Sequence, residues 1–423
     1  MMNTLHMRLE KDLLGTKQVD QAHYYGIQTL RALENFDLTS SKLSNYPYFI
    51  QAFAMVKLAA AEANYQLKRL PEQHYQAIRF ACEQLMQGNF LEQFPLDMLQ
   101  GGAGTSTNMN ANEVICNIAL EYMGHEKGQY QHLHPNNHVN MSQSTNDVYP
   151  TAIRLALLGD VERYQQRLIQ LIESLQAKAI EFKDVLKMGR TQLQDAVPMT
   201  LGQEFAAFAQ ILKQDLSLFR SLAERLSQVN LGGTAIGTGI NAPAQYQELA
   251  LAALSRMSQK NIQAAPDLIA ATSDMGDFVL LSGYLKRSAT KLSKIANDLR
   301  LLSSGPRAGL KEIHLEPRQP GSSIMPGKVN PVIPEAMNMA AFQVIANDLA
   351  VTLAAEAGQF QLNAMEPLIA FKLFDSLDLL QRSVQMFEQF CVRSIEANIE
   401  QCRHNVENSI GIITALNPYL GYE

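Results

Sequence analysis

Residues 321–330 have the sequence Gly321-Ser322-Ser323-Ile324-Met325-Pro326-Gly327-Lys328-Val329-Asn330. Two adjacent hydroxyl side chains stand between glycines, and a lysine and an asparagine follow them. This composition predicts a mobile loop that carries an oxygen base, several hydrogen-bond donors and one fixed positive charge. An enzyme that removes a proton from carbon beside a carboxylate needs this set, because donors already in position must meet the developing negative charge.

Three earlier segments share this polar, small-residue character. They are Gly101-Gly102-Ala103-Gly104-Thr105-Ser106-Thr107-Asn108-Met109-Asn110, His138-Val139-Asn140-Met141-Ser142-Gln143-Ser144-Thr145-Asn146-Asp147 and Gly189-Arg190-Thr191-Gln192-Leu193-Gln194-Asp195-Ala196-Val197-Pro198. With residues 321–330 they resemble, in the same order, the signature segments of the fumarase/aspartase superfamily of lyases. In detail they are most similar to its aspartase branch.

The composition is that of an ordinary soluble globular protein, with 47% apolar and 18% charged residues in a chain of 423. The net charge of −6 argues against nucleic acid as the main partner. The four cysteines have no metal-ligand spacing, so we expect buried free thiols in a reducing compartment. The first residues lack the apolar core of a signal peptide, and we therefore expect a cytoplasmic location.

Residues 336–355 contain a single charge, Asp348, which raises the question of a membrane span. Asn338, Gln343 and Asn347 interrupt this stretch. We therefore predict a helix buried inside a bundle, and no membrane association.

Most of the chain has helical periodicity. Apolar residues from Val161 to Leu175 and from Phe205 to Val229 recur in steps of three and four. The sequence predicts long helices over 161–185, 203–229, 274–302, 334–358 and 365–399. We find no clear alternating strand series, and the block before about residue 140 mixes shorter helices with irregular loops.

The resemblance implies a mainly α fold with a central bundle of long helices, which forms a twenty-helix core in a homotetramer. It places an N-terminal mixed helical domain at 1–142, the central bundle domain at 143–398 and the start of a small C-terminal domain, mostly absent, at 399–423. It also implies that each active site takes segments from different subunits.

The resemblance also assigns roles to individual residues. Ser322 matches the catalytic base, although an isolated serine in a glycine-rich loop is more often only a flexible polar side chain. The hydroxyls that match the β-carboxylate site are those of Thr105, Ser144, Thr145 and Ser323. Lys328 and Asn330 match the clamp of the α-carboxylate, and Asn146, Thr191 and Gln192 match the positions near the amino group.

The implied reaction is the reversible deamination of L-aspartate to fumarate and ammonium through an aci-carboxylate intermediate, without an organic cofactor. Gln192 speaks against the alternative, fumarate hydratase, since fumarases carry a histidine there and an amide does not titrate near neutral pH. An inactive structural relative and a substituted aspartate as substrate stay open. His132, His134 and His138 lack an ordered ligand pattern, so no metal site is predicted, while activation by a divalent cation stays open.

Overall fold

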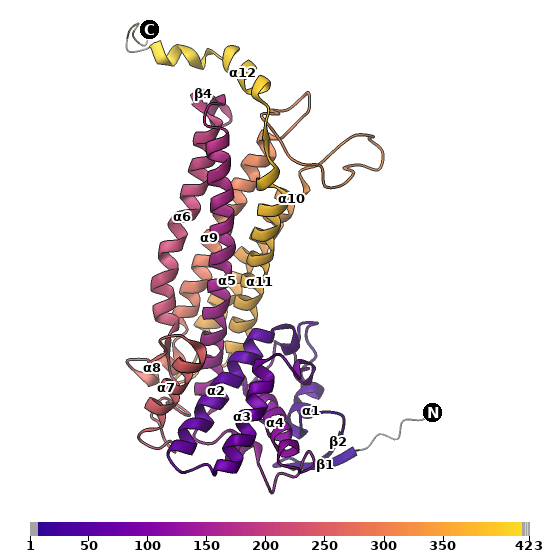
Figure 1. The fold of residues 1–423 in the computed structure, drawn as a ribbon, viewed down its shortest axis with the longest axis vertical. Coiled ribbons are helices and arrows are strands. Elements are labelled where there is room, and N and C mark those ends of the chain that lie inside the picture. The colour runs from indigo at the N-terminus through magenta and orange to yellow at the C-terminus, as the bar shows by residue number, and fades with distance from the viewer. Residues whose placement is uncertain (1–6, 417–418, 420, 422–423) are drawn as a thin grey trace. The chain divides into compact units, whose positions relative to one another are not determined.

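The structure, a computed structural model, describes residues 7–416, 419 and 421 (Figure 1). Residues 1–6, 417–418, 420 and 422–423 lie outside the described residues, and so does the corresponding part of the segment predicted at 399–423. The fold is mainly α, as the sequence predicts.

Helices make up most of the described chain. They are α1 (Ile27–Asn35), α2 (Pro47–Gln66), α3 (Glu72–Met86), α4 (Thr105–Tyr122), α5 (Thr145–Glu181), α6 (Leu201–Leu226), α7 (Tyr246–Ser258), α8 (Leu268–Ser273), α9 (Gly276–Leu302), α10 (Val332–Glu356), α11 (Glu366–Phe390) and α12 (Ile399–Glu407). The strands are short, and each sheet that the structure describes has two of them. They are β1 (Met7–Asp12) with β2 (Gly15–Asp20), β3 (Leu186–Thr191) with β4 (Gln194–Thr200), β5 (Gln228–Val229) with β6 (Gln263–Ala264) and β7 (Ile313–His314) with β8 (Glu396–Ala397).

The chain divides into two compact units, each built from separate segments. Unit 1 contains Met1–Asp160, Leu222–Leu281 and Leu349–Phe374, and unit 2 contains Val161–Ser221, Ser282–Asp348 and Asp375–Glu423. The sequence boundaries predicted near residues 142 and 398 remain a prediction.

Unit 1 forms around helices α2, α3 and α4, which pack against one another. Its interior includes an aromatic cluster in which Phe49 lies 5.6 Å from Phe53, 5.8 Å from Tyr149 and 5.1 Å from Phe374, between ring centroids. These side chains are all buried. The cluster fixes α2 against the first turns of α5, where one of the signature segments ends.

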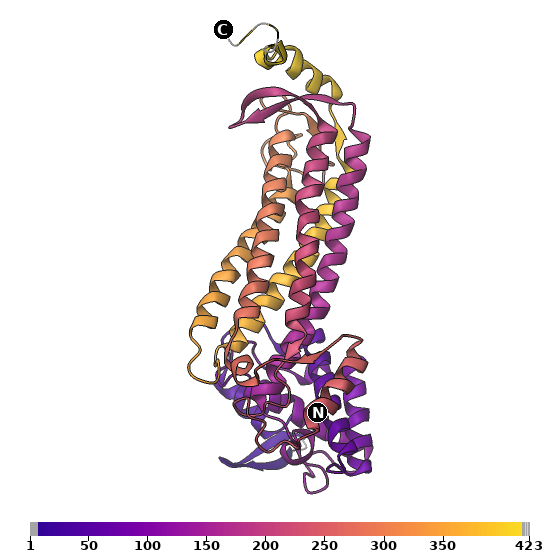
Figure 2. The same ribbon diagram turned by 90° about the vertical axis from the view of Figure 1, so that its left-hand side faces the viewer.

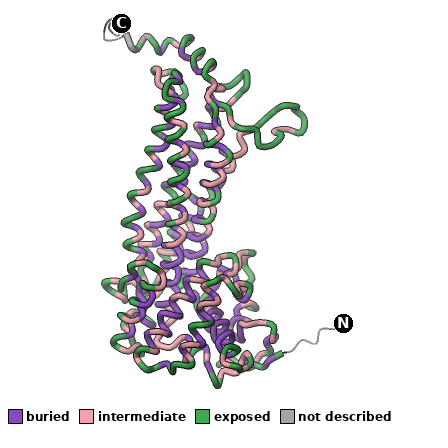
Figure 3. Tube along the Cα trace, in the orientation of Figure 1, coloured by how far each residue is buried: buried purple, intermediate pink, exposed green. Residues whose placement is uncertain are grey.

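Unit 2 is a bundle of long helices that run side by side in both views (Figures 1 and 2). Buried and exposed residues alternate along the helices of the bundle (Figure 3). Tyr164 of α5 contacts Phe219 of α6 at 5.8 Å between ring centroids, and Asn338 of α10 donates a 2.8 Å hydrogen bond to Ser293 of α9. The β3–β4 hairpin lies at the end of the bundle near α12 (Figure 2).

The five predicted long helices exist, and two of their ends lie far from the predicted positions. Helix α5 begins at Thr145, before the predicted Val161, and runs through Pro150. Proline cannot donate the helical hydrogen bond to the carbonyl of Asn146. The side chain of Asn230 donates to that carbonyl instead, at 2.9 Å, and so compensates for the missing donor.

The last long helix was predicted too long, because α11 ends at Phe390 rather than near residue 399. The residues that follow form a short 3₁₀ turn and then β8, which pairs with β7 from a distant part of the chain. Apolar periodicity in one segment carries no information about such a partner, and tertiary pairing decides the boundary here.

The β3–β4 hairpin, which contains the third signature segment, is not predicted by the sequence pattern. Its two-residue turn consists of Gln192 and Leu193, whose φ angles are 54° and 63°. Hairpins of this kind need positive φ at both turn residues and usually carry Asn-Gly or Asp-Gly. Gln-Leu is not one of the residue pairs that predict such a turn, so the sequence does not predict the hairpin.

The predicted helix over residues 334–358 is α10 of the bundle, but it is not buried on all sides, because Met339, Phe342 and Leu349 are exposed in the single chain. Among residues 7–416, 419 and 421, no helix combines the length and the hydropathy that a bilayer crossing requires. All four cysteines are buried free thiols, as predicted.

Candidate functional site

The signature loop at 321–330 lies in unit 2 and is closed at its base by two hydrogen bonds. The N–H of Gly321 donates to the carbonyl of Lys328 at 2.8 Å, and the amide of Asn330 donates to the carbonyl of Gly321 at 2.7 Å. Residues 323–329 are exposed. The loop is therefore pinned at its ends and open to solvent along its length.

The hydroxyl oxygen of Ser322 is held by the backbone of its own loop. It accepts hydrogen bonds from the N–H groups of Ile324, at 3.2 Å, and Met325, at 3.0 Å. Two backbone dipoles thus direct their positive ends at this oxygen, and they stabilise negative charge on it. The geometry suits an oxygen that must act as a base.

Two helix N-termini meet in unit 1 and carry Thr105, Ser144 and Thr145. Thr105 opens α4, Ser144 precedes the first residue of α5, and the amide of Asn108 donates to the Thr145 hydroxyl oxygen at 2.9 Å. Helix N-termini expose unpaired N–H groups and carry partial positive charge. This part of unit 1 therefore favours an anionic group.

The hydroxyls at these N-termini differ in what they already bind. Ser144 accepts from the N–H of Asn146 at 3.2 Å, and Thr145 accepts from Asn108, so both keep their hydrogens for another acceptor. Thr105 donates to the carbonyl of Gly102 at 2.8 Å. Its hydroxyl must rotate before it can donate to a ligand.

Asn146 is held in one orientation by neighbours from the 230–235 turn. Its side-chain amide donates to the carbonyl of Ala235 at 2.7 Å, and its own carbonyl accepts from Asn230. Because the NH₂ group is occupied in this way, the side-chain oxygen remains as an acceptor. An acceptor of this kind suits an ammonium group.

A buried lysine, Lys57, donates hydrogen bonds to residues close to these helix N-termini. The ammonium of Lys57 donates to the side-chain oxygens of Asn108, Asn140 and Gln143 at 2.6, 2.9 and 2.9 Å. Burial lowers the pKa of Lys57 to about 7, while the charge of Asp147 acts to raise it. Asn108 thus connects the buried cation to Thr145.

Asp147 ties α5 to the turn that holds Asn146. Its carboxylate accepts from the N–H of Ser144 at 2.9 Å and from those of Gly232 and Thr234 at 3.0 Å each. Burial raises the pKa of Asp147 to about 6, against the effect of these donors. Asp147 therefore holds the start of α5 against the turn that contacts Asn146.

Thr191 and Gln192 stand at the tip of the β3–β4 hairpin in unit 2, where both are exposed. The left-handed backbone at Gln192 is costly for a residue with a side chain, and the two-residue turn of the hairpin imposes it. Further along the hairpin, Asp195 accepts a 2.7 Å hydrogen bond from Ser409. The tip of the hairpin is therefore exposed, while the hydrogen bond from Ser409 holds the strand that follows the tip.

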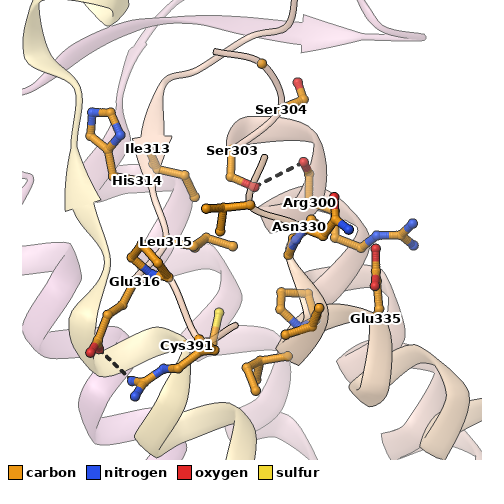
Figure 4. Close-up of a pocket in the computed structure, with 18 of the residues that line it drawn as sticks. Arg300, Ser303, Ser304, Ile313, His314, Leu315, Glu316, Asn330, Glu335 and Cys391 are labelled. Atoms are coloured by element: carbon orange, nitrogen blue, oxygen red, sulfur yellow. Dashed lines mark hydrogen bonds and ion pairs between the residues drawn. The ribbon is translucent and has the colours of Figure 1, made fainter. Parts of the chain in front are cut away.

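A cavity of about 990 Å³ lies beside the second half of the loop in unit 2 (Figure 4). Lys328 and Asn330 line it together with Arg300, Lys311 and Glu335, whereas Ser322 is not part of its lining. The basic side chains give this cavity an excess of positive charge near the loop, which suits a carboxylate.

The sequence-predicted residues therefore form three groups. Ser322, Ser323, Lys328 and Asn330 share the loop, Thr191 and Gln192 share the hairpin tip, and Thr105, Ser144, Thr145 and Asn146 share the two helix starts of unit 1. The first two groups belong to unit 2.

No metal-binding group of three or more His, Cys, Asp or Glu side chains occurs in the part of the chain that the structure describes. The histidine at position 138 accepts, through Nδ1, a 2.8 Å hydrogen bond from the N–H of His134. The absence of a metal site remains a prediction, and activation by a divalent cation stays open.

Comparison with known proteins adds the family. A sequence profile of the family described as Lyase matches residues 15–346. The chain is 66% identical to aspartate ammonia-lyase of Pseudomonas aeruginosa over 417 residues, covering 98% of this chain and 88% of that protein. It is 53% identical to aspartate ammonia-lyase of Escherichia coli over 418 residues, covering 99% and 87%.

This chain belongs to the aspartate ammonia-lyase family.

Solved structures agree with this placement. A fumarate lyase:delta crystallin from Brucella melitensis matches with a TM-score of 0.96 at 56% identity, covering 98% of this chain and 90% of that one. Recombinant class II fumarase from Schistosoma mansoni matches with a TM-score of 0.95 at 36% identity, covering 99% and 90%. The aspartate ammonia-lyase family thus shares its fold with fumarases, and the fold alone does not choose the reaction.

The structure adds supporting residues to which the sequence pattern assigns no role. Asn108, Asn140 and Asp147 belong to the signature segments, while Lys57 lies outside every segment. A lysine inside an otherwise apolar helical stretch was the available signal, since lysine is almost never fully buried without partners.

Proposed function

We propose that this chain catalyses the reversible deamination of L-aspartate to fumarate and ammonium, with no organic cofactor. The observation that carries the proposal is the 53–66% identity to aspartate ammonia-lyases over nearly the whole chain. The polar groups described above supply the chemistry that this reaction requires.

The first step is removal of a proton from Cβ. The alkoxide of Ser322 takes this proton and becomes a hydroxyl, while the electron pair of the broken C–H bond moves into the β-carboxylate. The product is an aci-carboxylate with two negative charges on one group. The N–H groups of Ile324 and Met325, which contact Ser322 Oγ, support the role because they stabilise its ionised form.

The doubled charge must be met by donors already in place. We assign this task to the hydroxyls of Thr105, Ser144, Thr145 and Ser323. Hydroxyls at the N-termini of α4 and α5 suit it, since they donate without adding charge and lie in the positive field of two helices. Such preorganised donors stabilise developing charge at little reorganisation cost.

In the second step the electron pair returns from the aci-carboxylate and forms the double bond of fumarate. The Cα–N bond of the protonated amine breaks, and its electron pair leaves with nitrogen as ammonia. The hydroxyl of Ser322 then releases the proton that came from Cβ, which converts ammonia to ammonium and restores the alkoxide. Lys328 and Asn330 hold the α-carboxylate, and Asn146, Thr191 and Gln192 position the amine. The free side-chain oxygen of Asn146 supports its part in this step.

Assembly into a homotetramer with shared active sites completes the proposal. Helix α10 supports it, because its large exposed apolar residues recur in steps of three and four along one face. They are Met339, Phe342, Ile345, Leu349 and Leu353, with exposed fractions of 64%, 59%, 37%, 62% and 60%. A second copy of the chain would cover such a face.

Charge on this face should prevent assembly. We expect Phe342→Lys to sediment as a smaller species than the wild-type protein and to lose about a hundredfold or more in turnover, because the interface would bury an unpaired charge. Leu38→Lys, at a site 67% exposed and far from α10 in sequence, is the control. Unchanged sedimentation of Phe342→Lys would remove α10 from the interface.

A cytoplasmic location belongs to the proposal as well. Four buried free thiols support it, since thiols persist in a reducing compartment. Assays with and without a chelator, followed by added divalent cations, test whether the reaction is activated by a metal.

The deciding experiment compares two incubations of the purified protein. With fumarate plus ammonium, we expect aspartate to form; with fumarate alone, we expect no malate. Nuclear magnetic resonance distinguishes aspartate from malate in each tube. Malate without aspartate would make the chain a fumarate hydratase, and no product in either tube would make it an inactive relative.

A further inference from the structure

Glu312 is a carboxylate with no exposed surface, and it lies in unit 2 between α9 and β7. Its Oε1 accepts hydrogen bonds from Arg190 at 2.7 Å and from Asn405 at 3.0 Å. The ammonium of Lys187 lies 3.1 Å from Oε2 as a charge contact. The side chain therefore joins strand β3 to helix α12.

The backbone of Glu312 makes further connections. Its N–H donates to the carbonyl of Leu302 at the end of α9, at 2.8 Å. Its carbonyl accepts from the N–H of Asn398 at 2.9 Å and from the thiol of Cys402 at 3.4 Å. One residue thus joins the end of α9, strand β3, the start of α12 and the segment that leads into the signature loop.

The charges around Glu312 are balanced. Lys187 also contacts Glu204 at 2.6 Å, so two basic side chains face two acidic ones. Burial by itself raises the pKa of Glu312, but Arg190, Lys187 and Asn405 hold that pKa below its usual value. Glu312 is therefore ionised at neutral pH, and removing its charge leaves Arg190 without its anionic partner.

Arg190 is the residue directly before the hairpin tip. Thr191 and Gln192 are exposed and receive little support from packing, and Gln192 has the left-handed backbone conformation described above. Arg190 points its guanidinium to Glu312 rather than to solvent, and its side chain is 14% exposed. The Arg190–Glu312 contact is thus the nearest charged anchor of the tip on its own strand.

We propose that Glu312 is a positioning residue for the amine side of the reaction: it holds Arg190, and through Arg190 it fixes the direction in which Thr191 and Gln192 face the substrate. This inference rests on the proposed function, because it takes the hairpin tip as the contact of the amino group. Glu312 itself touches no substrate. It also begins the segment that leads to the loop of Ser322, so the hairpin and the loop share one anchor.

The test measures the reverse reaction, in which ammonium and fumarate are separate substrates. In Glu312→Gln we expect the KM for ammonium to rise about tenfold to a hundredfold, as a small misplacement of a positioning group does. The KM for fumarate should stay within about twofold, since its carboxylates are held elsewhere. A purely structural defect would lower the amount of active protein and leave both KM values unchanged.

Two further variants keep the test decisive. Arg190→Met leaves Glu312 paired with Lys187 and Asn405, so we expect this variant to fold even if Glu312→Gln does not. It should show the same selective rise in the KM for ammonium. Glu204→Gln removes an acidic partner of Lys187 and keeps both members of the Arg190–Glu312 hydrogen bond. It is the matched control, and we expect unchanged KM values. Equal changes in the two KM values, or no change, in both Arg190→Met and Glu312→Gln would overturn the proposal.

A second measurement does not depend on activity. Hydrogen–deuterium exchange of the backbone amides in residues 189–196 should speed up about tenfold in Glu312→Gln and Arg190→Met, but not in Glu204→Gln. Wild-type exchange in both variants would overturn the positioning role. If the wild-type protein makes no aspartate, the proposed function fails, while the exchange result still decides whether Glu312 holds the hairpin tip.

Discussion

Ser322→Ala should keep the fold and the assembly of the wild-type protein and lose nearly all turnover. The change removes one oxygen atom from a half-buried loop position, so little stability depends on it. General-base catalysis contributes about 10²–10⁴-fold, and we expect kcat for deamination of aspartate to fall by at least that factor. Fumarate release measures the loss, and thermal unfolding confirms that the fold is intact.

The control for this variant is Ser303→Ala, because Ser303 lines the cavity of unit 2, has no role in the proposed reaction, and donates to the carbonyl of Arg300 at 3.2 Å. It should turn over as the wild type does. Wild-type turnover in Ser322→Ala would exclude the serine as the base, and equal losses in the two variants would point to a general effect on the loop.

Lys328→Met should weaken aspartate binding more than it slows the chemical step. A hydrogen bond to a charged group contributes about 1.5–3 kcal/mol, which corresponds to about a 10- to 150-fold change in affinity. Because Lys328 is assigned to the α-carboxylate, which does not gain charge in the reaction, we expect the loss mainly in KM. Steady-state kinetics over a wide range of aspartate concentrations separate the two constants.

Lys311→Met is the matched control, since Lys311 lines the same cavity and belongs to neither carboxylate site. It should change KM by no more than about twofold. If both lysine variants weakened binding equally, the cavity would act through its overall charge. A fall in kcat with KM unchanged in Lys328→Met would instead assign the lysine to the reacting carboxylate.

The sequence was most informative where chemistry and local pattern coincide. Loop 321–330 carries its hydroxyls, lysine and asparagine within one short segment, so its candidate residues could be named from the sequence alone. The long helices were equally accessible, because an apolar face at helical spacing is a local property. The mainly α fold and the family placement both agree with these expectations.

The ends of the helices and strands, and the residues that support the candidate site, could not be predicted in this way. The hairpin tip at Gln192 has backbone angles that the residue types of the turn do not predict. Helix α11 ends before β8, which pairs with the distant strand β7. Lys57 and Glu312 are positioned by residues far away in the sequence. No local pattern contains those partners, so only the folded chain reveals them.

A ligand-bound structure of the assembled protein tests the central claim most directly. With an unreactive aspartate analogue in place, Ser322 Oγ should lie about 3–3.5 Å from the carbon that corresponds to Cβ, with the hydroxyls of Thr105, Ser144 and Thr145 directed at the β-carboxylate. An analogue bound with Ser322 beyond that reach and these hydroxyls turned away would contradict the account.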